Sequence, residues 1–180
     1  MTEVWLDITD IPAQGREFSF SDPSLWTDPI KEYALPHIMA GDAPLAAEFT
    51  IIPQGRGVLV RGTLKGAVVT PCDRCAEDAR IEFDETFDLF EELPLEGEEV
   101  LEQALLRKRG KILELNISGL LWEQFVLAMP VKPLCEDSCP GLCPGCGRKL
   151  SRGTCDCESV GGDPRLAALR KVKIGHKGNQ

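Results

Sequence analysis

The sequence has few of the side chains on which enzyme active sites commonly depend. Its 180 residues include two histidines, His37 and His176, and neither lies near the cysteines in the chain. Catalytic zinc sites keep an open position and commonly use His or carboxylate ligands, so a site of that kind is not indicated. The chain also lacks a phosphate-cradling glycine loop and a Gly-x-Ser-x-Gly nucleophile elbow. We therefore expect a protein that is not an enzyme and has no small-molecule substrate.

Long apolar runs are also missing. No stretch approaches the roughly 20 apolar residues that cross a bilayer, so no membrane contact is expected. The start, Met1–Asp7, lacks the basic-then-apolar pattern of a secretory signal, which favours a cytoplasmic location. Cysteine, at 8 of 180 residues, is about half as frequent as in a disulfide-built secreted domain. In reducing cytoplasm, clustered cysteines indicate metal ligands before they indicate disulfides.

Charge is distributed unevenly along the chain. The 29 acidic residues outnumber the 20 basic ones, which gives a net charge of −9. Residues 77–102 hold twelve acids and one base, whereas residues 164–180 hold five bases and no acid. The bases of this tail are Arg165, Arg170, Lys171, Lys173 and Lys177. The acidic body argues against a protein that coats nucleic acid, and the basic tail is the expected contact for RNA or a partner.

Hydrophobic residues make up 43% of the chain, enough for a core, and their spacing predicts a β-sheet. Apolar residues alternate over 45–51, 58–68 and 79–90, as they do in half-buried strands, and residues 3–8 could add a first strand. The Gly- and Pro-rich residues 53–57 predict a hairpin. Because the connections are short, the sheet should be antiparallel.

One helix is predicted with definite ends. Asn116 can cap its first turn, and Pro130 stops it after Met129. Residues 98–115 stay ambiguous between helix and strand, and the prolines of residues 22–36 leave room only for short helices or turns. The predicted fold class is α+β, with an antiparallel sheet or partial barrel, few helices and a small cysteine-rich module towards the C-terminal end.

The cysteine spacing is typical of structural zinc sites. Leu142-Cys-Pro-Gly-Cys-Gly147 has the form of a zinc knuckle, in which two thiolates reach one ion from a tight turn and glycine lets amide N–H groups face the sulfurs. The leading ligand set is Cys143, Cys146, Cys155 and Cys157, provided that the segment from Cys155 to Cys157 turns. Cys135 and Cys139 are substitutes within this set or half of a second site, which Cys72 and Cys75 would complete. One or two structural zinc ions are expected.

Other interpretations of the cysteines stay open. The thiols could be free or oxidised. An iron–sulfur cluster is possible, although the bacterial C-x2-C-x2-C spacing is missing. A thioredoxin-like role for Cys72 and Cys75 is weak, because the pair lies between strands and does not open a helix of a βαβ unit. With zinc preferred, the expected organisation is a β-rich domain over 1–130, a zinc-binding module over 131–160 and a basic tail over 161–180.

Four segments together resemble a known family. They are Cys72–Cys75 after a strand, Leu115–Pro130, Cys135–Cys157 and Asp163–Leu169. In this order they resemble the bacterial and plastid large ribosomal RNA subunit accumulation proteins, the YceD family. The match covers residues from about 70 to 172, with Asn116 where the family usually has Asp and Ser151 where it usually has Asn. The resemblance implies a non-enzymatic factor that supports synthesis, processing or stability of 23S ribosomal RNA.

The expected partners follow from this resemblance and from the charges. The acidic stretch 77–102 could hold a basic ribosomal protein or the pre-ribosomal large subunit, and the tail Arg165–Lys177 could touch RNA phosphates. Two other classes stay open. One is a zinc-ribbon adaptor that binds a protein without RNA contact, which the net charge favours. The other is a thiol-redox protein.

Overall fold

The computed structural model describes residues 3–93, 104–153 and 155–157, and its chain divides into two compact units, Met1–Asp137 and Ser138–Gln180. In the first unit the elements are β1 (Trp5–Asp7), β2 (Arg16–Phe20), α1 (Ser24–Glu32), β3 (Ile38–Met39), β4 (Ala46–Gln54), β5 (Gly57–Pro71), β6 (Asp78–Glu92), β7 (Leu106–Arg109), β8 (Ile112–Asn116) and α2 (Ile117–Ala128). The second unit contains the 3-10 turn η1 (Leu150–Arg152). The predicted α+β class is confirmed.

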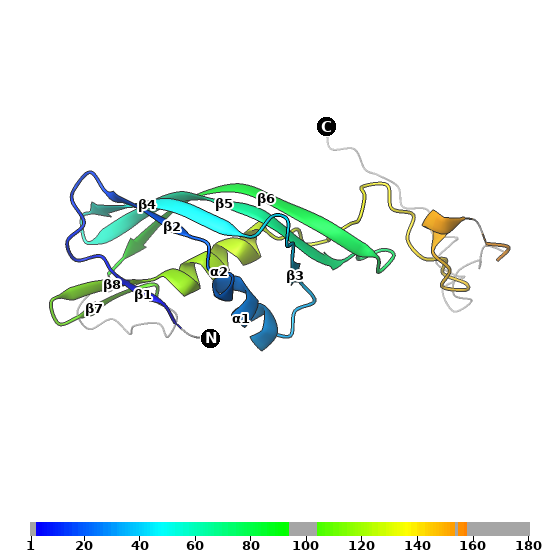
Figure 1. Cartoon of the computed structure of the whole chain (residues 1–180), viewed down its shortest axis with the longest axis horizontal. Helices are drawn as coiled ribbons and strands as arrows, with labels where there is room; N and C mark the ends of the chain where they lie inside the picture. Colours follow the sequence, from blue (N-terminus) through cyan, green and yellow to red (C-terminus); the bar gives the residue numbers. More distant parts are fainter. Residues whose placement is uncertain (1–2, 94–103, 154, 158–180) are drawn as a thin grey trace, which may run out of the picture. The chain divides into compact units, whose positions relative to one another are not determined.

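The larger sheet is built around β5 (Figure 1). One edge of β5 pairs with β6 along its full length, and the other edge pairs with β4 and then with β3. β2 extends the sheet beyond β4. A second, three-stranded sheet has the order β1-β8-β7. Every pairing is antiparallel, as the short connections predicted.

The alternation of apolar residues decides which face of the sheet is buried. Val58, Val60, Leu64 and Val68 of β5 all point to the core and are at most 2% exposed. The same face includes Gly66 at φ +133°, where an added Cβ would lie 2.7 Å from the Cα of the residue that precedes β4. Close approach of the neighbouring loop therefore requires glycine at this position.

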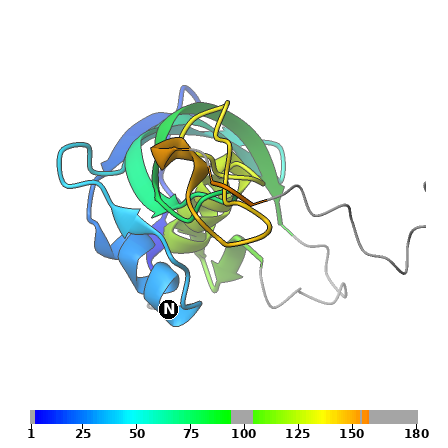
Figure 2. The same cartoon turned by 90° about the vertical axis from the view of Figure 1, so that its right-hand side faces the viewer.

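Helix α2 fills the concave side of the sheet, as Figure 2 shows. Asn116 caps it as predicted: its Oδ1 accepts from the N–H of Gly119 at 2.9 Å and from the hydroxyl of Ser118 at 2.8 Å. Phe125 is fully buried and stacks on Phe83 of β6, with ring centroids 5.4 Å apart. The sequence also predicts that the apolar residues of this helix, Leu127 among them, face the core. This prediction is wrong at Leu127, which is 71% exposed.

Two regions that the sequence left undecided are now described. Residues 22–36 contain α1, a nine-residue helix with Pro29 inside it that buries Trp26 completely. Of the ambiguous residues 98–115, the part from 106 onward forms the β7–β8 hairpin. The possible helix falls mostly on residues 94–103, which lie outside the described residues. Among the described residues, no helix is long and apolar enough to cross a membrane.

The second unit has little regular structure where it is described. An isolated antiparallel bridge joins Leu142 to Lys149, and Leu150 donates its N–H to the carbonyl of Gly141 at 3.0 Å. Its buried hydrophobic residues, within the described part, are Cys139 and Cys143. A unit this small without an aliphatic core ordinarily needs a metal ion or disulfides to hold its fold.

Candidate metal centres

The turn between β5 and β6 forms a tight cysteine knuckle. The N–H of Cys72 donates to the carbonyl of Glu77 at 2.7 Å, and the carbonyl of Cys72 accepts from the N–H of Ala76 at 2.9 Å. The sulfur of Cys72 accepts from the N–H of Arg74 at 3.4 Å. Ala76, directly after Cys75, has the left-handed φ of +57°. The turn thus directs both sulfurs and one amide N–H to the same side.

A second turn, far along the chain, repeats this pattern position by position. The N–H of Cys143 donates to the carbonyl of Arg148 at 2.8 Å, and its carbonyl accepts from the N–H of Gly147 at 2.8 Å. Its sulfur accepts from the N–H of Gly145 at 3.4 Å. Gly147, directly after Cys146, has φ +71°. Two Cys-x-x-Cys turns of unrelated surroundings therefore share one geometry, in which an amide stabilises sulfur charge.

Each knuckle is completed by two further cysteines. The first cysteine group is Cys72, Cys75, Cys135 and Cys139, and the second cysteine group is Cys143, Cys146, Cys155 and Cys157. Within each group all four sulfurs lie within 4.8 Å of one another. The structure thus brings together the leading set and, from the open alternatives, the second set of four. Whether these residues bind a metal ion stays a prediction.

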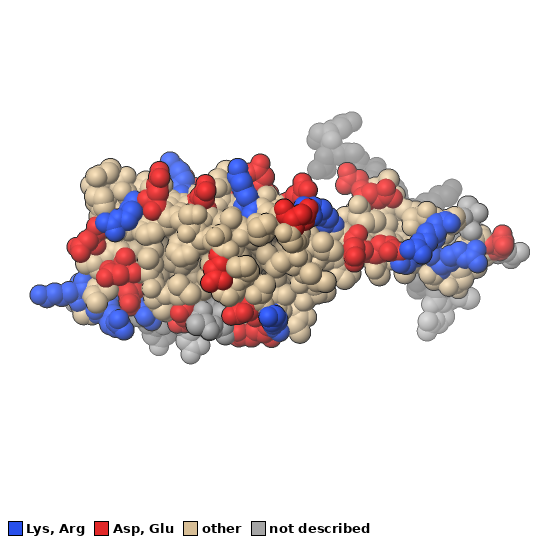
Figure 3. Space-filling view, in the orientation of Figure 1, with Lys and Arg blue, Asp and Glu red and all other residues tan. Residues whose placement is uncertain are grey.

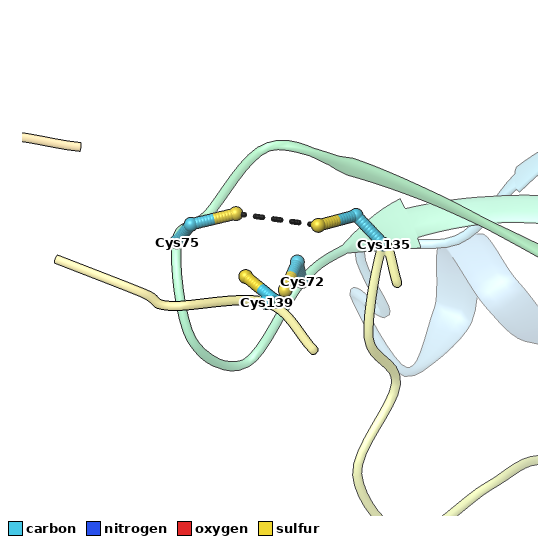
Figure 4. Close-up of side chains that lie close together, drawn as sticks. All are labelled: Cys72, Cys75, Cys135 and Cys139. Atoms are coloured by element: carbon cyan, nitrogen blue, oxygen red, sulfur yellow. Dashed lines mark hydrogen bonds between the residues drawn. The ribbon is translucent and has the colours of Figure 1, made fainter. Parts of the chain in front are cut away.

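The sulfur separations fit a tetrahedral ion. Four sulfurs at about 2.3 Å from zinc lie about 3.8 Å from one another in a regular tetrahedron. In the first cysteine group the sulfurs of Cys75 and Cys135 are 3.6 Å apart (Figure 4), and in the second those of Cys155 and Cys143 are 3.2 Å apart. A disulfide would need about 2.05 Å, and none links the eight cysteines, all of which are described.

The prediction of the second cysteine group had a condition: the chain must turn between Cys155 and Cys157 so that both side chains can reach one ion. In an extended segment the two side chains would point to opposite sides. Here the segment has no strand or helix geometry, and both sulfurs reach the group. The Cβ that Gly145 lacks would lie 3.4 Å from the Sγ of Cys157, so the knuckle and this segment pack closely. The condition on the leading set is therefore met: both side chains lie with Cys143 and Cys146.

The thiol pKa values reflect this crowding of sulfur and amide groups. Burial raises the pKa of Cys72, but backbone hydrogen bonds, including the one from Arg74, outweigh it and lower the pKa to about 6. Backbone and thiol hydrogen bonds, from Cys146 and Cys155 first, lower the pKa of Cys143 to about 6. The hydrogen bond between Cys157 and Cys146 raises the pKa of Cys157 to about 12. One sulfur of each group is thus favoured as thiolate, the form that binds metal.

The remaining predicted site residues lie elsewhere. His37 hydrogen-bonds through Nδ1 to the hydroxyl of Thr70 at 3.0 Å and packs edge-on against Phe125, and it belongs to neither cysteine group. The tail bases Arg165, Arg170, Lys171, Lys173 and Lys177, together with His176, lie outside the described residues.

The acids of residues 77–102 are less available than their number suggests. On β6, Asp84 pairs with Lys65 of β5 at 3.4 Å, and Asp88 pairs with Arg61 at 2.5 Å. Glu92 pairs in the same way with Arg56, in the turn before β5. Figure 3 shows this mixture of charges along the sheet. Counting charges along the sequence misses such pairs, because their partners are 19 to 36 residues away.

Comparison with known proteins identifies the family. The sequence matches the family described as large ribosomal RNA subunit accumulation protein YceD over residues 60–173, which is more than half of the chain and includes both cysteine groups. It is 30% identical over 98 residues to uncharacterized proteins of Mycobacterium bovis and Mycobacterium tuberculosis, an alignment that covers 53% of this chain and 46% of each relative. The chain thus spans about half the length of the curated relatives it matches. No solved structure matches it. The chain belongs to the YceD family of large ribosomal RNA subunit accumulation proteins.

Proposed function

We propose that this protein is a non-enzymatic factor that supports synthesis, processing or stability of the 23S ribosomal RNA in the cytoplasm. The observation that carries this proposal is the family match over residues 60–173, which takes in the central strands, α2 and both knuckles. The family is described by the accumulation of large-subunit ribosomal RNA and not by a reaction. A binding role also agrees with the described site, whose chemistry is a set of thiols suited to hold a metal ion.

Zinc is the ion that we propose for both cysteine groups. Four thiolates without an open position form the ligand set of structural zinc sites. Each knuckle supplies an N–H to sulfur, and such bonds stabilise negative charge on the ligands. The ions would stabilise the turn between β5 and β6 and the second unit. Metal analysis of the purified chain should give two zinc ions, and zinc-free protein with reversible Cys72–Cys75 oxidation would favour the thiol-redox alternative.

We further propose contacts with both RNA and protein of the pre-ribosomal large subunit. The five tail bases from Arg165 to Lys177 would meet phosphates. A basic ribosomal protein would meet acids of residues 77–102 that are not already engaged by Arg56, Arg61 and Lys65. Crosslinking in cells separates this proposal from a protein-binding adaptor, because the adaptor would recover no 23S fragments.

The decisive experiment is genetic. Deleting the gene in its own bacterium should lower the ratio of 23S to 16S ribosomal RNA, and a plasmid copy should restore it. A matched copy with Cys143 and Cys146 both changed to serine tests the metal site separately. An unchanged RNA ratio after deletion would overturn the proposed function whatever the metal content of the protein.

A further inference from the structure

The hairpin formed by β7 and β8 has the densest group of bases among the described residues. Four of the five residues from Arg107 to Lys111 are basic, and Gly110 is the exception. Arg109 pairs with Ile112 across a two-residue turn. Gly110 has φ +67° at the first turn position, as in the type II′ turns that join tight hairpins. The local sequence therefore folds the bases around one tip.

The bases of this tip are exposed. Lys108 and Lys111 are exposed, and the side chain of Arg109 is 70% exposed. In Figure 3 basic side chains gather at the end of the body where Figure 1 places the β7–β8 turn. An exposed cluster of one charge sign is unfavourable by itself, since like charges repel. It is expected where a surface meets a polyanion.

A single buried acid organises the base of the hairpin. Glu114, whose side chain is 9% exposed, accepts from Nε of Arg107 at 2.9 Å and lies 3.4 Å from the guanidinium of Arg109. Arg107 also lies over the ring of Trp5, with its Cζ 3.5 Å from the centroid. These contacts fix the two arginines. Residues 106–115 contain four bases and this one acid, so the hairpin keeps a net charge of +3.

The exposed bases in and before β5 differ from those of the hairpin, because each has an acidic partner of its own. Arg61 and Lys65 each face an acid on β6, and so does Arg56 in the preceding turn. Their charge is therefore offset locally. Three exposed bases of the hairpin, Lys108, Arg109 and Lys111, can therefore be compared with the three exposed bases Arg56, Arg61 and Lys65. Each of the latter three faces an acid of its own, whereas residues 106–115 of the hairpin hold the single acid Glu114.

We infer that the β7–β8 hairpin binds the phosphate backbone of RNA, through Lys108, Arg109 and Lys111. This inference rests on the proposed function and deepens it, because it assigns RNA contact to a surface of the body besides the tail. Lysine and arginine contacts with phosphates supply most of the sequence-independent affinity for nucleic acid. RNA is favoured over an acidic protein because the tip combines several exposed positive charges with little exposed apolar surface: among the described residues of the hairpin, Ile112 is the exposed large hydrophobic one.

The test compares two triple variants of the full chain. The hairpin variant carries Lys108→Ala, Arg109→Ala and Lys111→Ala. The control variant carries Arg56→Ala, Arg61→Ala and Lys65→Ala, which removes the same net charge. Both sets are exposed, so each variant should fold, which circular dichroism and zinc content would verify.

Binding is measured by fluorescence anisotropy with a labelled single-stranded RNA of about 20 nucleotides, over a range of salt concentrations. Loss of three phosphate contacts should reduce the slope of log affinity against log salt by about 2. At about 0.1 M salt the affinity of the hairpin variant should fall by about 10-fold to 100-fold, and that of the control variant by less.

Three outcomes would overturn the inference. The hairpin variant could bind RNA as tightly as the unmodified chain, the two variants could lose affinity equally, or the unmodified chain could bind a polyglutamate probe as tightly as RNA. None of these decides the proposed function, which depends on the 23S to 16S ratio in the deletion strain. Conversely, an unchanged ratio there would overturn the function even if the hairpin binds RNA.

Discussion

Replacing Cys143 with serine tests whether a metal ion holds the second unit in its fold. The second knuckle is built around this residue: its N–H donates to Arg148, its carbonyl accepts from Gly147, and its sulfur accepts from Gly145. Serine leaves the backbone groups in place but offers a neutral hydroxyl where zinc binds a thiolate. We expect the zinc content to fall from two ions per chain to one.

How much stability the second unit loses in this variant depends on how little else stabilises it. Cys139 and Cys143 are its buried hydrophobic residues within the described part, so burial of apolar surface contributes little. With free zinc about 1,000 times above the dissociation constant, binding stabilises the folded unit by about 4 kcal/mol. That stabilisation corresponds to amide exchange slowed about 1,000-fold, since exchange from the unit requires it to open.

Hydrogen exchange with mass spectrometry on the full chain measures this effect. In the Cys143→Ser variant the amides of Gly147 and Leu150 should lose that protection, whereas those of Val60 and Leu64 in β5 should keep theirs. Ser151→Ala, an exposed change in the same unit, should alter nothing, and a zinc chelator should reproduce the loss. Simultaneous loss of protection in β5 would refute the reasoning, as would full protection of Gly147 in the variant.

Four further substitutions test individual positions, each by denaturant unfolding. Asn116→Ala removes the cap of α2 and should destabilise the first unit by about 1–2 kcal/mol; a change below measurement error would mean that the cap is dispensable. Ala76→Gly should stabilise the first knuckle and Gly147→Ala should destabilise the second, each by about 1 kcal/mol, because both positions have left-handed φ. If both substitutions changed the free energy of unfolding in the same direction, the result would contradict the shared geometry of the two knuckles. Gly66→Ala should cost about 2–4 kcal/mol, since its Cβ would meet backbone at 2.7 Å, and a neutral result would show that the loop before β4 yields.

The sequence predicts the central strands and α2 because their signals are local. Val58 to Val68 alternate within one strand, and the cap of α2 is Asn116 itself. Helix α1 was not predicted as a helix of this length, because Pro29 breaks its pattern and its stability comes from burying Trp26 against distant residues. The intrinsic helix propensity of the residues does not include such tertiary stabilisation.

The cysteine groups were largely predictable and the knuckle geometry only in part. Spacing grouped Cys143 with Cys146, and it offered both quartets among its alternatives. Gly147 signalled a left-handed residue after the second cysteine of one knuckle. Ala76 gives no such signal, since alanine seldom takes this conformation, and the structure alone places it there. Repetition of one hydrogen-bond pattern in both turns is the stronger argument for a common ligand, because their sequences share nothing beyond the two cysteines and their spacing.

Net charge is a poor guide to what this protein contacts. The value of −9 includes acids of β6 that already face Arg61 and Lys65, so part of the apparent acidic surface is neutral at short range. The bases of the β7–β8 hairpin have Glu114 as their one acid within residues 106–115. Because screening limits surface charges to about 10 Å at about 0.1 M salt, a phosphate approaching the hairpin senses these nearby bases more than the whole protein. An acidic protein can therefore bind RNA through local basic elements, and the hairpin should contribute to the salt dependence of binding beside the tail.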